Sequence, residues 1–254
     1  MASASPGTVV FILQWRFIIR PGFPFQNQLN MEKFQKLRPG GKAYLIIAAM
    51  PTPNGRLHLG HMSGPYLKMD MITRARRRNG EQATFISGSD GYESYVALKA
   101  WEMDKTPEEV CHYFSNLALK DLQALDIYYD SYVNPLSSGH KTEFANYAKT
   151  CVQDLIDKDL VTIRPEKIKY SPAGNRYLVG CWLLGKCPNC QQGAGSYQCE
   201  DCGTQFRPMD MLESYSRAGD TDLVEIDDCA LYLKIQNKEE LFHRIDQMGF
   251  PEDF

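Results

Sequence analysis

Two short apolar runs set the pattern of the first half of the chain. Residues 42–50 (KAYLIIAAM) and 83–90 (ATFISGSD) are rich in consecutive apolar residues, and this predicts strands that are buried on both faces. Between them, apolar residues recur at helical spacing from Met62, and Asn79-Gly80 is a typical helix stop. The pattern therefore predicts a strand, a helix and a second strand in succession.

The next segment continues this alternation. The stretch TPEEV (106–110) matches a helix start, with a capping threonine, a proline in the first turn and a glutamate three residues after the cap. We expect this helix to end near residue 125, a third strand at 127–133 and a further helix at 140–160. Strands that alternate with helices predict an α/β fold with a parallel sheet and right-handed crossovers.

The pattern changes at about residue 160. The stretch 160–226 has short β-like pieces and turns but no long helix, which predicts an inserted subdomain. Residues 227–235 predict a strand that returns to the main domain, and residues 238–248 predict a helix.

Composition narrows the class of protein. A chain of 254 residues with 43% hydrophobic and 23% charged residues is typical of a soluble globular protein. The net charge of -3 gives no sign of a basic coat, although a local basic patch would be enough for a nucleic acid. No apolar run approaches the roughly 18 residues that span a bilayer, so we expect no membrane partner.

The N-terminal segment has two interpretations. Residues 1–31 contain no acidic residue, and two arginines follow an apolar stretch, as in some targeting peptides. Because the apolar stretch precedes the arginines and no clear cleavage site follows, an over-long start with Met31 as the initiator is the favoured alternative.

Four of the eight cysteines form the pattern C-x2-C-x8-C-x2-C: Cys187, Cys190, Cys199 and Cys202. Two C-x-x-C turns supply the tetrahedral four-thiolate shell that zinc prefers, and such a closed site predicts a structural Zn²⁺. Two disulfides or a redox pair are the alternatives, but a redox motif usually lies near a βαβ pattern that this segment lacks. A chain of this length needs no disulfide staples, which favours a reducing compartment.

The stretch PTPNGRLHLGHMSG (51–64) places His58 and His61 at a predicted helix start behind a strand. Backbone N–H groups at such a start attract phosphate, and imidazoles can donate hydrogen bonds to charge that develops at phosphorus. Gly60, between the histidines, would let a nucleotide base lie close to the backbone. The alternative is that the histidines merely cap the helix, and the residues alone leave both possibilities open.

Asp90 follows the second predicted strand. Ligands of open parallel sheets bind beyond the carboxyl ends of the strands, so we expect Asp90 to face the same crevice as the histidines. Its carboxylate could hold a substrate ammonium group, or it could cap the helix that begins near Ser94.

Together these motifs resemble those of class I aminoacyl-tRNA synthetases and, within that class, the methionyl enzymes. The signature H-x-G-H with its upstream P-x-x-N-G is matched by Pro51, Asn54, Gly55, His58, Gly60 and His61. The position of Asp90 resembles that of the family aspartate that holds the amino group of the amino acid. The stretch YSPAGNRYL and the four cysteines resemble the zinc-bearing connective peptide, so the resemblance runs from about residue 42 to the C-terminus.

This resemblance implies a Rossmann-like (HUP-type) parallel sheet, present here as its N-terminal half, with an inserted zinc-knuckle connective peptide. It implies four parts: an N-terminal extension (1–40), a nucleotide-binding half-domain (41–159), the zinc-binding insertion (160–226) and a return segment (227–254). With half of the sheet missing, we expect apolar surface to be exposed.

The resemblance also implies amino-acid activation. The carboxylate attacks the α-phosphorus of ATP, which Mg²⁺ accompanies, and the acyl group then passes to the 3′-end of a tRNA. His58 and His61 would be the catalytic residues, because they would stabilise the transition-state phosphates. ATP would bind at Pro51, Asn54, Gly55, His58, Gly60 and His61. Methionine or an analogue would bind at Met50, Thr52 and Asp90.

Three positions depart from the family pattern. Thr52 replaces an aromatic residue that helps to wall the methionine pocket, Gly91-Tyr92 replaces an acidic or histidine pair, and Gly180-Cys181 replaces an Asp-Arg pair. The second class signature, K-M-S-K-S, and the anticodon-binding helical domain do not occur in the 254 residues.

Three hypotheses of function follow. The first is a fragment or truncated paralog of a methionyl-type synthetase, completed by a partner half or a continuing chain that carries the KMSKS loop. The second is a paralog that activates another amino acid for specialised metabolism without tRNA, and the third is an inactive zinc-bearing binding module. We expect a cytoplasmic location, with an organelle as the alternative. The run RARRR (74–78) could touch tRNA phosphates, although charged helix ends are usually just solvated.

Overall fold

The computed structural model describes residues 43–249 of the chain. The two interpretations of residues 1–31, and the predicted extension 1–40, concern residues outside this range. The chain divides after His140 into two compact units, called unit 1 and unit 2 below, and each is described by itself.

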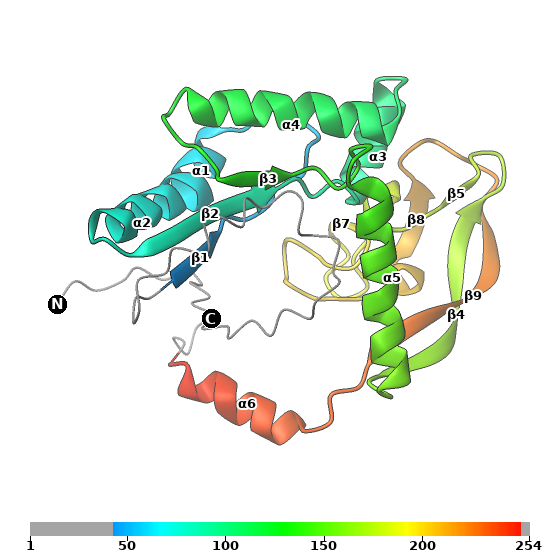
Figure 1. Cartoon of the computed structure of the whole chain (residues 1–254). Helices are drawn as coiled ribbons and strands as arrows, with labels where there is room; N and C mark the ends of the chain where they lie inside the picture. The colour runs from blue at the N-terminus through cyan, green and yellow to red at the C-terminus, as the bar shows by residue number, and fades with distance from the viewer. Residues whose placement is uncertain (1–42, 250–254) are drawn as a thin grey trace. The chain divides into compact units, whose positions relative to one another are not determined.

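Unit 1 contains a three-stranded parallel sheet in the order β1-β2-β3. Its strands are β1 (Ala43–Ile47), β2 (Gln82–Gly88) and β3 (Ser131–Val133). Its helices are α1 (Leu59–His61), α2 (Leu67–Arg78), α3 (Ser94–Glu102) and α4 (Pro107–Gln123). The alternation of strands and helices and the parallel pairing confirm the predicted α/β fold (Figure 1).

One core cluster of unit 1 packs against one face of this sheet. Tyr66, just before α2, and Leu122 of α4 are each 1% exposed and share a cluster with Phe85 of β2. On the other side of β1, Leu45 and Ile47 are 45% and 56% exposed. The prediction that this strand is buried on both faces is therefore wrong, because side chains alternate across a strand and, within residues 43–249, the core cluster covers the side of Ile46.

The predicted helix after the histidine motif is present and starts earlier than expected. α1 runs through a π-helical turn, Met62–Tyr66, directly into α2. Pro65 lies inside this turn, and its lack of an N–H group accounts for the interrupted α-helical ladder. Asn79 caps the end of α2 and Gly80 has a φ of +75°, which confirms the predicted helix stop.

The predicted start of α4 is confirmed in detail. The backbone N–H of Glu109 donates to Thr106 Oγ1 at 3.2 Å, and the N–H of Thr106 donates to Glu109 Oε2 at 2.8 Å. This reciprocal pair satisfies two N–H groups that would otherwise lack partners at the helix start.

Unit 2 begins with a helix and continues as antiparallel strands. Its helices are α5 (Lys141–Asp157) and α6 (Lys238–Gln247). One sheet has the order β5-β4-β9, from β4 (Val161–Ser171), β5 (Arg176–Tyr177) and β9 (Val224–Leu233). The other has the order β7-β6-β8, from β6 (Leu183–Lys186), β7 (Gly193–Gly195) and β8 (Leu212–Ser216). Short 3₁₀ turns lie at Gly180–Trp182 and Pro208–Asp210.

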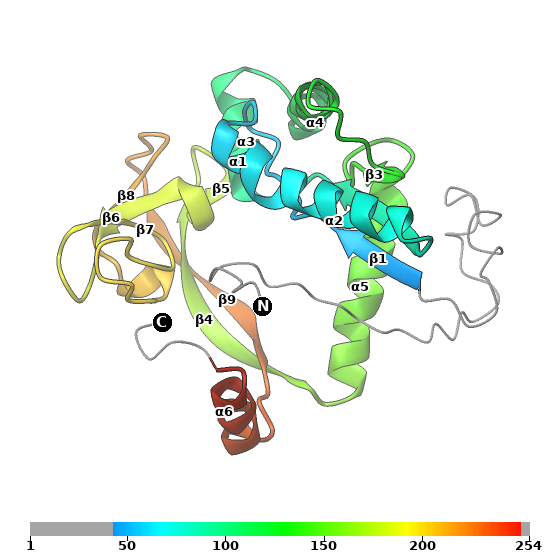
Figure 2. The ribbon, with the colours of Figure 1, turned by 90° about the vertical axis from the view of Figure 1, so that its left-hand side faces the viewer.

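The long ribbon of β4 and β9 dominates unit 2 (Figure 2). It pairs from Val161 opposite Leu233 to Tyr170 opposite Val224. The strand predicted at 227–235 is thus β9, and it pairs with β4 instead of returning to the parallel sheet. The predicted boundary between residues 159 and 160 falls inside unit 2, since α5 groups with the strands that follow it.

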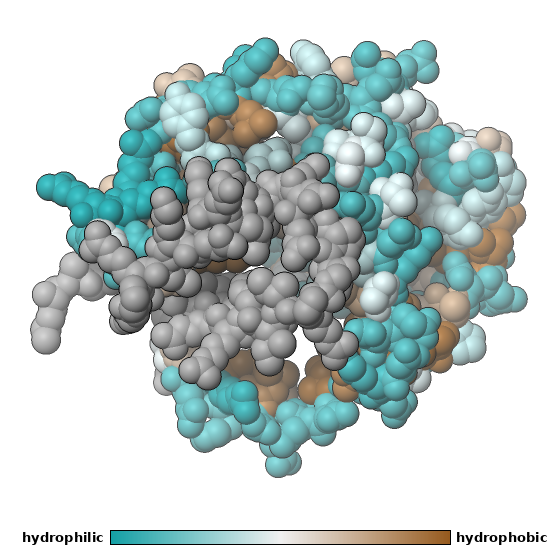
Figure 3. Space-filling model, in the orientation of Figure 1, coloured by the Kyte–Doolittle hydropathy of each residue, from teal (hydrophilic) through white to brown (hydrophobic). Residues whose placement is uncertain are grey.

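Apolar side chains remain at the surface of unit 2. Neither α5 nor α6 buries a residue, and Phe144 of α5 and Phe242 of α6 are 44% and 60% exposed. Figure 3 shows apolar surface near α6. Within residues 43–249, no helix has the length and apolarity needed to cross a membrane.

Candidate functional site

The loop from Ala48 to His58 connects β1 to α1, and several contacts fix it in place. The backbone N–H of Ala48 donates to the carbonyl of Ile86 at 3.0 Å, so the loop leaves the sheet beside β2. Pro53 is buried, and Leu57 packs against the core cluster of unit 1. These contacts hold the loop in place without a ligand.

His58 and His61 lie together at the start of the helix. Their rings stack with centroids 3.7 Å apart and an interplanar angle of 20°. The backbone N–H of His61 lies 3.3 Å from His58 Nδ1, and that of His58 lies 3.4 Å from His61 Nδ1. The capping alternative is thus observed, although both hydrogen bonds are long. Because His58 is exposed and His61 half-buried, capping leaves the rings accessible to a ligand.

Two local effects shape this histidine pair. A Cβ atom on Gly60 would lie 3.1 Å from the ring of His58, so the glycine makes room for the stacked imidazole. Partial burial, followed by the nearby charge of His58, lowers the pKa of His61. A neutral ring at His61 is therefore favoured near neutral pH.

Asp90 lies at the end of β2, next to the histidine loop. Its backbone N–H donates to the carbonyl oxygen of Pro51 at 3.0 Å, which joins the two connections that follow β1 and β2. Partial burial, followed by the charge of Glu93, raises the pKa of the Asp90 carboxyl. The predicted capping role of Asp90 is wrong, because Glu93 caps α3 by accepting from the N–H of Tyr95 at 2.7 Å.

A buried hydrogen-bond network holds the residue before Asp90, and no sequence motif indicates its members. Ser89 Oγ lies 2.5 Å from Ser115 Oγ of α4 and 2.9 Å from the hydroxyl of Tyr132 in β3. Gly91, on the other side of Asp90, packs so closely that a Cβ atom there would lie 3.2 Å from Cys111 Sγ. The polar residues at the end of β2 could have indicated this network in the sequence. Their partners, Ser115 and Tyr132, could not, because they come from distant segments.

Met50 and Thr52, the other predicted amino-acid-binding residues, flank Pro51. Met50 is 58% exposed, and its sulfur would lie 3.4 Å from a Cβ atom placed on Gly88. Thr52 is half-buried, and its carbonyl accepts a hydrogen bond of 2.9 Å from the N–H of Asn54. The structure therefore brings Met50, Thr52 and Asp90 onto two adjoining loops.

Three of the four arginines in the run 74–78 form ion pairs within unit 1. Arg74 forms ion pairs with Asp70 at 2.7 Å and with Asp126 at 3.2 Å. Arg76 pairs with Glu81 at 3.2 Å. Arg77 pairs with Asp130. These pairs give the basic run a structural role in joining α2 to neighbouring turns.

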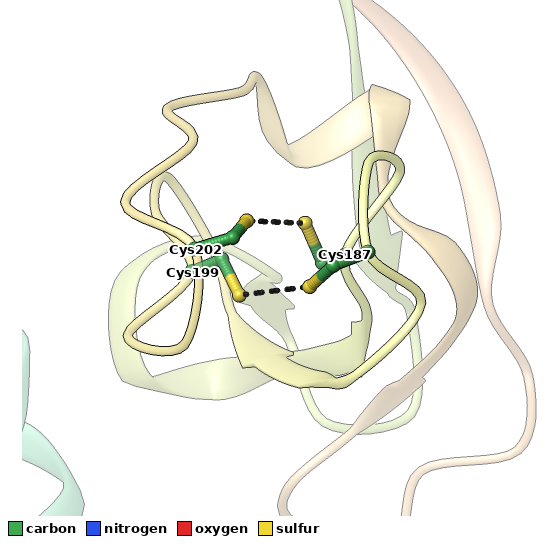
Figure 4. Close-up of side chains that lie close together, drawn as sticks. Cys187, Cys199 and Cys202 are labelled. Carbon is green, nitrogen blue, oxygen red and sulfur yellow. Dashed lines mark hydrogen bonds between the residues drawn. The ribbon is translucent and has the colours of Figure 1, made fainter.

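The four predicted metal-ligating cysteines converge in unit 2 (Figure 4). Their sulfur atoms all lie within 4.8 Å of one another. Cys187 Sγ is 3.8 Å from Cys202 Sγ, and Cys190 Sγ is 3.6 Å from Cys199 Sγ. None of the eight cysteines forms a disulfide bond, and these separations far exceed the roughly 2.05 Å of an S–S bond, so the disulfide alternative is not observed.

Each cysteine pair sits on a tight turn. The N–H of Gln191 donates to the carbonyl of Cys187 at 3.0 Å, and the N–H of Gly203 donates to that of Cys199 at 2.9 Å. Gly203 has a φ of +70°, as expected for the residue after the last predicted ligand. Hydrogen bonding to Thr204 lowers the pKa of Cys202 to about 6.

A family model and two curated relatives match most of this chain. The family model described as tRNA synthetases class I (M) matches residues 44–245. The methionine–tRNA ligase of Parabacteroides distasonis is 30% identical over 176 residues, which are 69% of this chain and 25% of that relative. That of Porphyromonas gingivalis is 31% identical over the same share of each chain. The chain thus spans about a quarter of the length of these curated relatives.

A solved structure supports the fold. The methionyl-tRNA synthetase of Mycobacterium tuberculosis, in complex with methionyl-adenylate, superposes with a TM-score of 0.55 at 17% identity. The match covers 84% of this chain and 37% of that one. Since the family model covers most of the described residues, this chain belongs to the class I tRNA synthetases (M).

Proposed function

We propose that this chain forms the ATP- and amino-acid-binding part of a methionyl-type synthetase, which joins an amino acid to AMP before transfer to tRNA. The observation that carries the proposal is the hydrogen bond from the N–H of Asp90 to the carbonyl of Pro51. It holds the histidine loop and the strand-end carboxylate at the same edge of a parallel sheet, where open α/β folds bind their ligands.

The histidine loop would bind the nucleotide. Exposed His58 and half-buried His61 can donate hydrogen bonds to phosphate oxygens as charge develops during attack on the α-phosphorus. Pro51, Asn54, Gly55 and Gly60 shape the backbone around them. Mg²⁺ would accompany the ATP and neutralise part of its charge.

The adjoining loop would bind the amino acid. Asp90 is exposed at the end of β2, and its carboxylate can pair with the substrate ammonium group. Met50 and Thr52 would then face the substrate side chain. Methionine or an analogue fits this proposal, because the curated relatives that the chain resembles are methionine–tRNA ligases.

The cysteine cluster would hold a structural Zn²⁺. Four sulfurs that surround one zinc at about 2.3 Å in a tetrahedron lie about 3.8 Å apart. The separations of 3.8 Å and 3.6 Å between the paired cysteines fit that arrangement. With four protein ligands the ion would have no open position, so its role would be to fold the predicted insertion 160–226 around it.

We propose that a continuing chain or a partner half supplies the KMSKS loop and the remaining strands, and that tRNA binds only the completed form. The exposed Leu45 and Ile47 of β1 support this idea, since they leave apolar surface at the edge of the parallel sheet. We place this activity in the cytoplasm, with an organelle as the alternative.

A second candidate function is activation of a different amino acid without tRNA. Thr52 replaces the aromatic wall of the family's methionine pocket, and Gly91 packs against Cys111 where the family has a larger polar residue. These changes alter the surroundings of Asp90 without removing it. A binding module without catalytic activity is the third candidate, and it would need only the cysteine cluster and the fold.

Amino-acid-dependent exchange of pyrophosphate into ATP separates the candidates. The assay uses the purified chain, alone and after addition of a synthetase half that carries the KMSKS loop, with each of the twenty standard amino acids. Exchange with methionine alone supports the synthetase and rules out the second candidate. Exchange with another amino acid supports the second. No exchange and no ATP binding in either form supports the binding module.

A further inference from the structure

Arg56 links the histidine loop to α4. Its side chain forms two hydrogen bonds with the carboxylate of Asp121, one of them from Nε to Oδ2 at 3.2 Å. Arg56 stands two residues before His58, whereas Asp121 lies near the end of α4. The pair therefore joins two segments that are far apart in the sequence.

The two partners differ in burial. The Arg56 side chain is 66% exposed, but that of Asp121 is only 8% exposed. Within the described part of the chain, the carboxylate of Asp121 bonds to Arg56 and to no other side chain. A buried carboxylate that loses its cation is strongly unfavourable, so Asp121 holds Arg56 in place.

The helix start beyond this ion pair is exposed. α1 buries no residue, and Leu59 between the histidines is 82% exposed. The apolar anchors of the loop, Pro53 and Leu57, both precede His58. Arg56 lies between these two anchors in the sequence. Its side chain bonds to Asp121 and so connects the loop to α4.

We propose that the Arg56–Asp121 ion pair is a tether that positions His58 and His61 for the nucleotide, and that Arg56 is a positioning residue. The effect of this tether on ATP binding rests on the proposed function. The tether itself can be tested without a ligand. The competing role for Arg56 is direct binding of an ATP phosphate through the N–H groups that do not face Asp121, since a guanidinium carries five of them and only two bond to Asp121.

The test uses the imidazole NMR signals of the full chain. The chain has five histidines, so the ring signals of His58 and His61 can be assigned by single substitutions. In Arg56→Ala we expect both signals to shift toward those of free imidazole, because the stacked pair loosens, while His243 of α6 stays unchanged. The double variant Arg56→Asp/Asp121→Arg restores the charge pair and should return both signals toward wild type.

A matched control and a conservative variant complete the design. Arg207 pairs with Asp210 through two hydrogen bonds and is 64% exposed, close to the 66% of Arg56, so Arg207→Ala should leave the histidine signals unchanged. Arg56→Lys keeps the charge but not the paired geometry, so it should give shifts of intermediate size. If Arg56→Ala does not fold, the double variant and Arg56→Lys still decide the question.

Titration with ATP distinguishes the outcomes. A tether predicts that Arg56→Ala weakens ATP binding by at least about tenfold and that the double variant recovers it. Unchanged histidine signals in Arg56→Ala would overturn the tether, and loss of ATP binding in the double variant as well would identify Arg56 as a phosphate ligand. If the wild type binds no ATP, the proposed function fails, whereas the histidine signals still test the tether.

Discussion

The backbone N–H of Asp90 donates a hydrogen bond of 3.0 Å to the carbonyl oxygen of Pro51. This contact joins the connection after β1 to the connection after β2, so the backbone fixes the distance between the histidine loop and the carboxylate. The side chain of Asp90 takes no part in the contact, which leaves its carboxylate for a ligand.

Replacement of Asp90 by Asn should weaken amino-acid binding and leave ATP binding nearly unchanged. A hydrogen bond between charged groups contributes about 1.5–3 kcal/mol, so we expect the dissociation constant of the amino acid to rise about 10- to 100-fold. Calorimetric titration with each ligand measures both constants. Glu93→Gln, which keeps an oxygen to cap α3, is the control. Equal weakening of ATP would contradict the assignment of Asp90 to the ammonium group.

Removal of zinc should unfold the cysteine cluster and leave unit 1 intact. We expect one zinc ion per chain by elemental analysis, and loss of this zinc in Cys202→Ser. Cys229→Ser is the matched control, because Cys202 and Cys229 are both exposed but only Cys202 belongs to the cluster. A full zinc content in Cys202→Ser, or none in the wild type, would contradict the proposed site.

Substitution of Gly91 by Ala should destabilise unit 1. The added Cβ atom would lie 3.2 Å from both Cys111 Sγ and Leu136 Cγ, and overpacking of this kind costs about 1–3 kcal/mol. Chemical denaturation measures the loss. Gly139→Ala is the control, since a Cβ atom at that position would meet nothing within 4 Å. Similar free energies of unfolding for the two variants would show that the strand end can relax.

The stability of the protein should fall on acidification, in part because of His61. Burial, followed by the charge of His58, lowers the pKa of His61 in the folded state, so the unfolded state takes up this proton first as the pH falls. The contribution is complete above the unfolded pKa of about 6.5 and is lost as the pH falls below it. We expect the melting temperature of His61→Gln to drop less than that of the wild type between pH 7.5 and 5.5. His112→Gln, at an exposed position of α4, should behave like the wild type.

Local patterns in the sequence determined most of the elements of this fold. The capping pair of Thr106 and Glu109 and the stop at Asn79-Gly80 act within a single turn, so they could be identified from adjacent residues. The same holds for the cysteine pattern, because each C-x-x-C turn fixes two ligands through its own backbone.

The family motifs also located the histidine pair and Asp90 before the structure was known. The motifs did not show which neighbouring residue caps α3. Glu93 caps α3 where Asp90 was one candidate, because the choice depends on which carboxylate reaches the N–H of Tyr95. Likewise, β9 pairs with β4, since its register is set by a partner strand that lies far earlier in the sequence.

Contacts between distant segments hold the site together. The contact between Asp90 and Pro51 depends on the parallel pairing of β1 with β2, and the tether between Arg56 and Asp121 depends on where α4 lies against the loop. The exposure of Leu45 and Ile47 depends on which face of the sheet is covered. The sequence alone determined the local elements and the chemistry of the motifs, because these depend on neighbouring residues. The long-range contacts needed the fold, because they join segments that no local pattern relates.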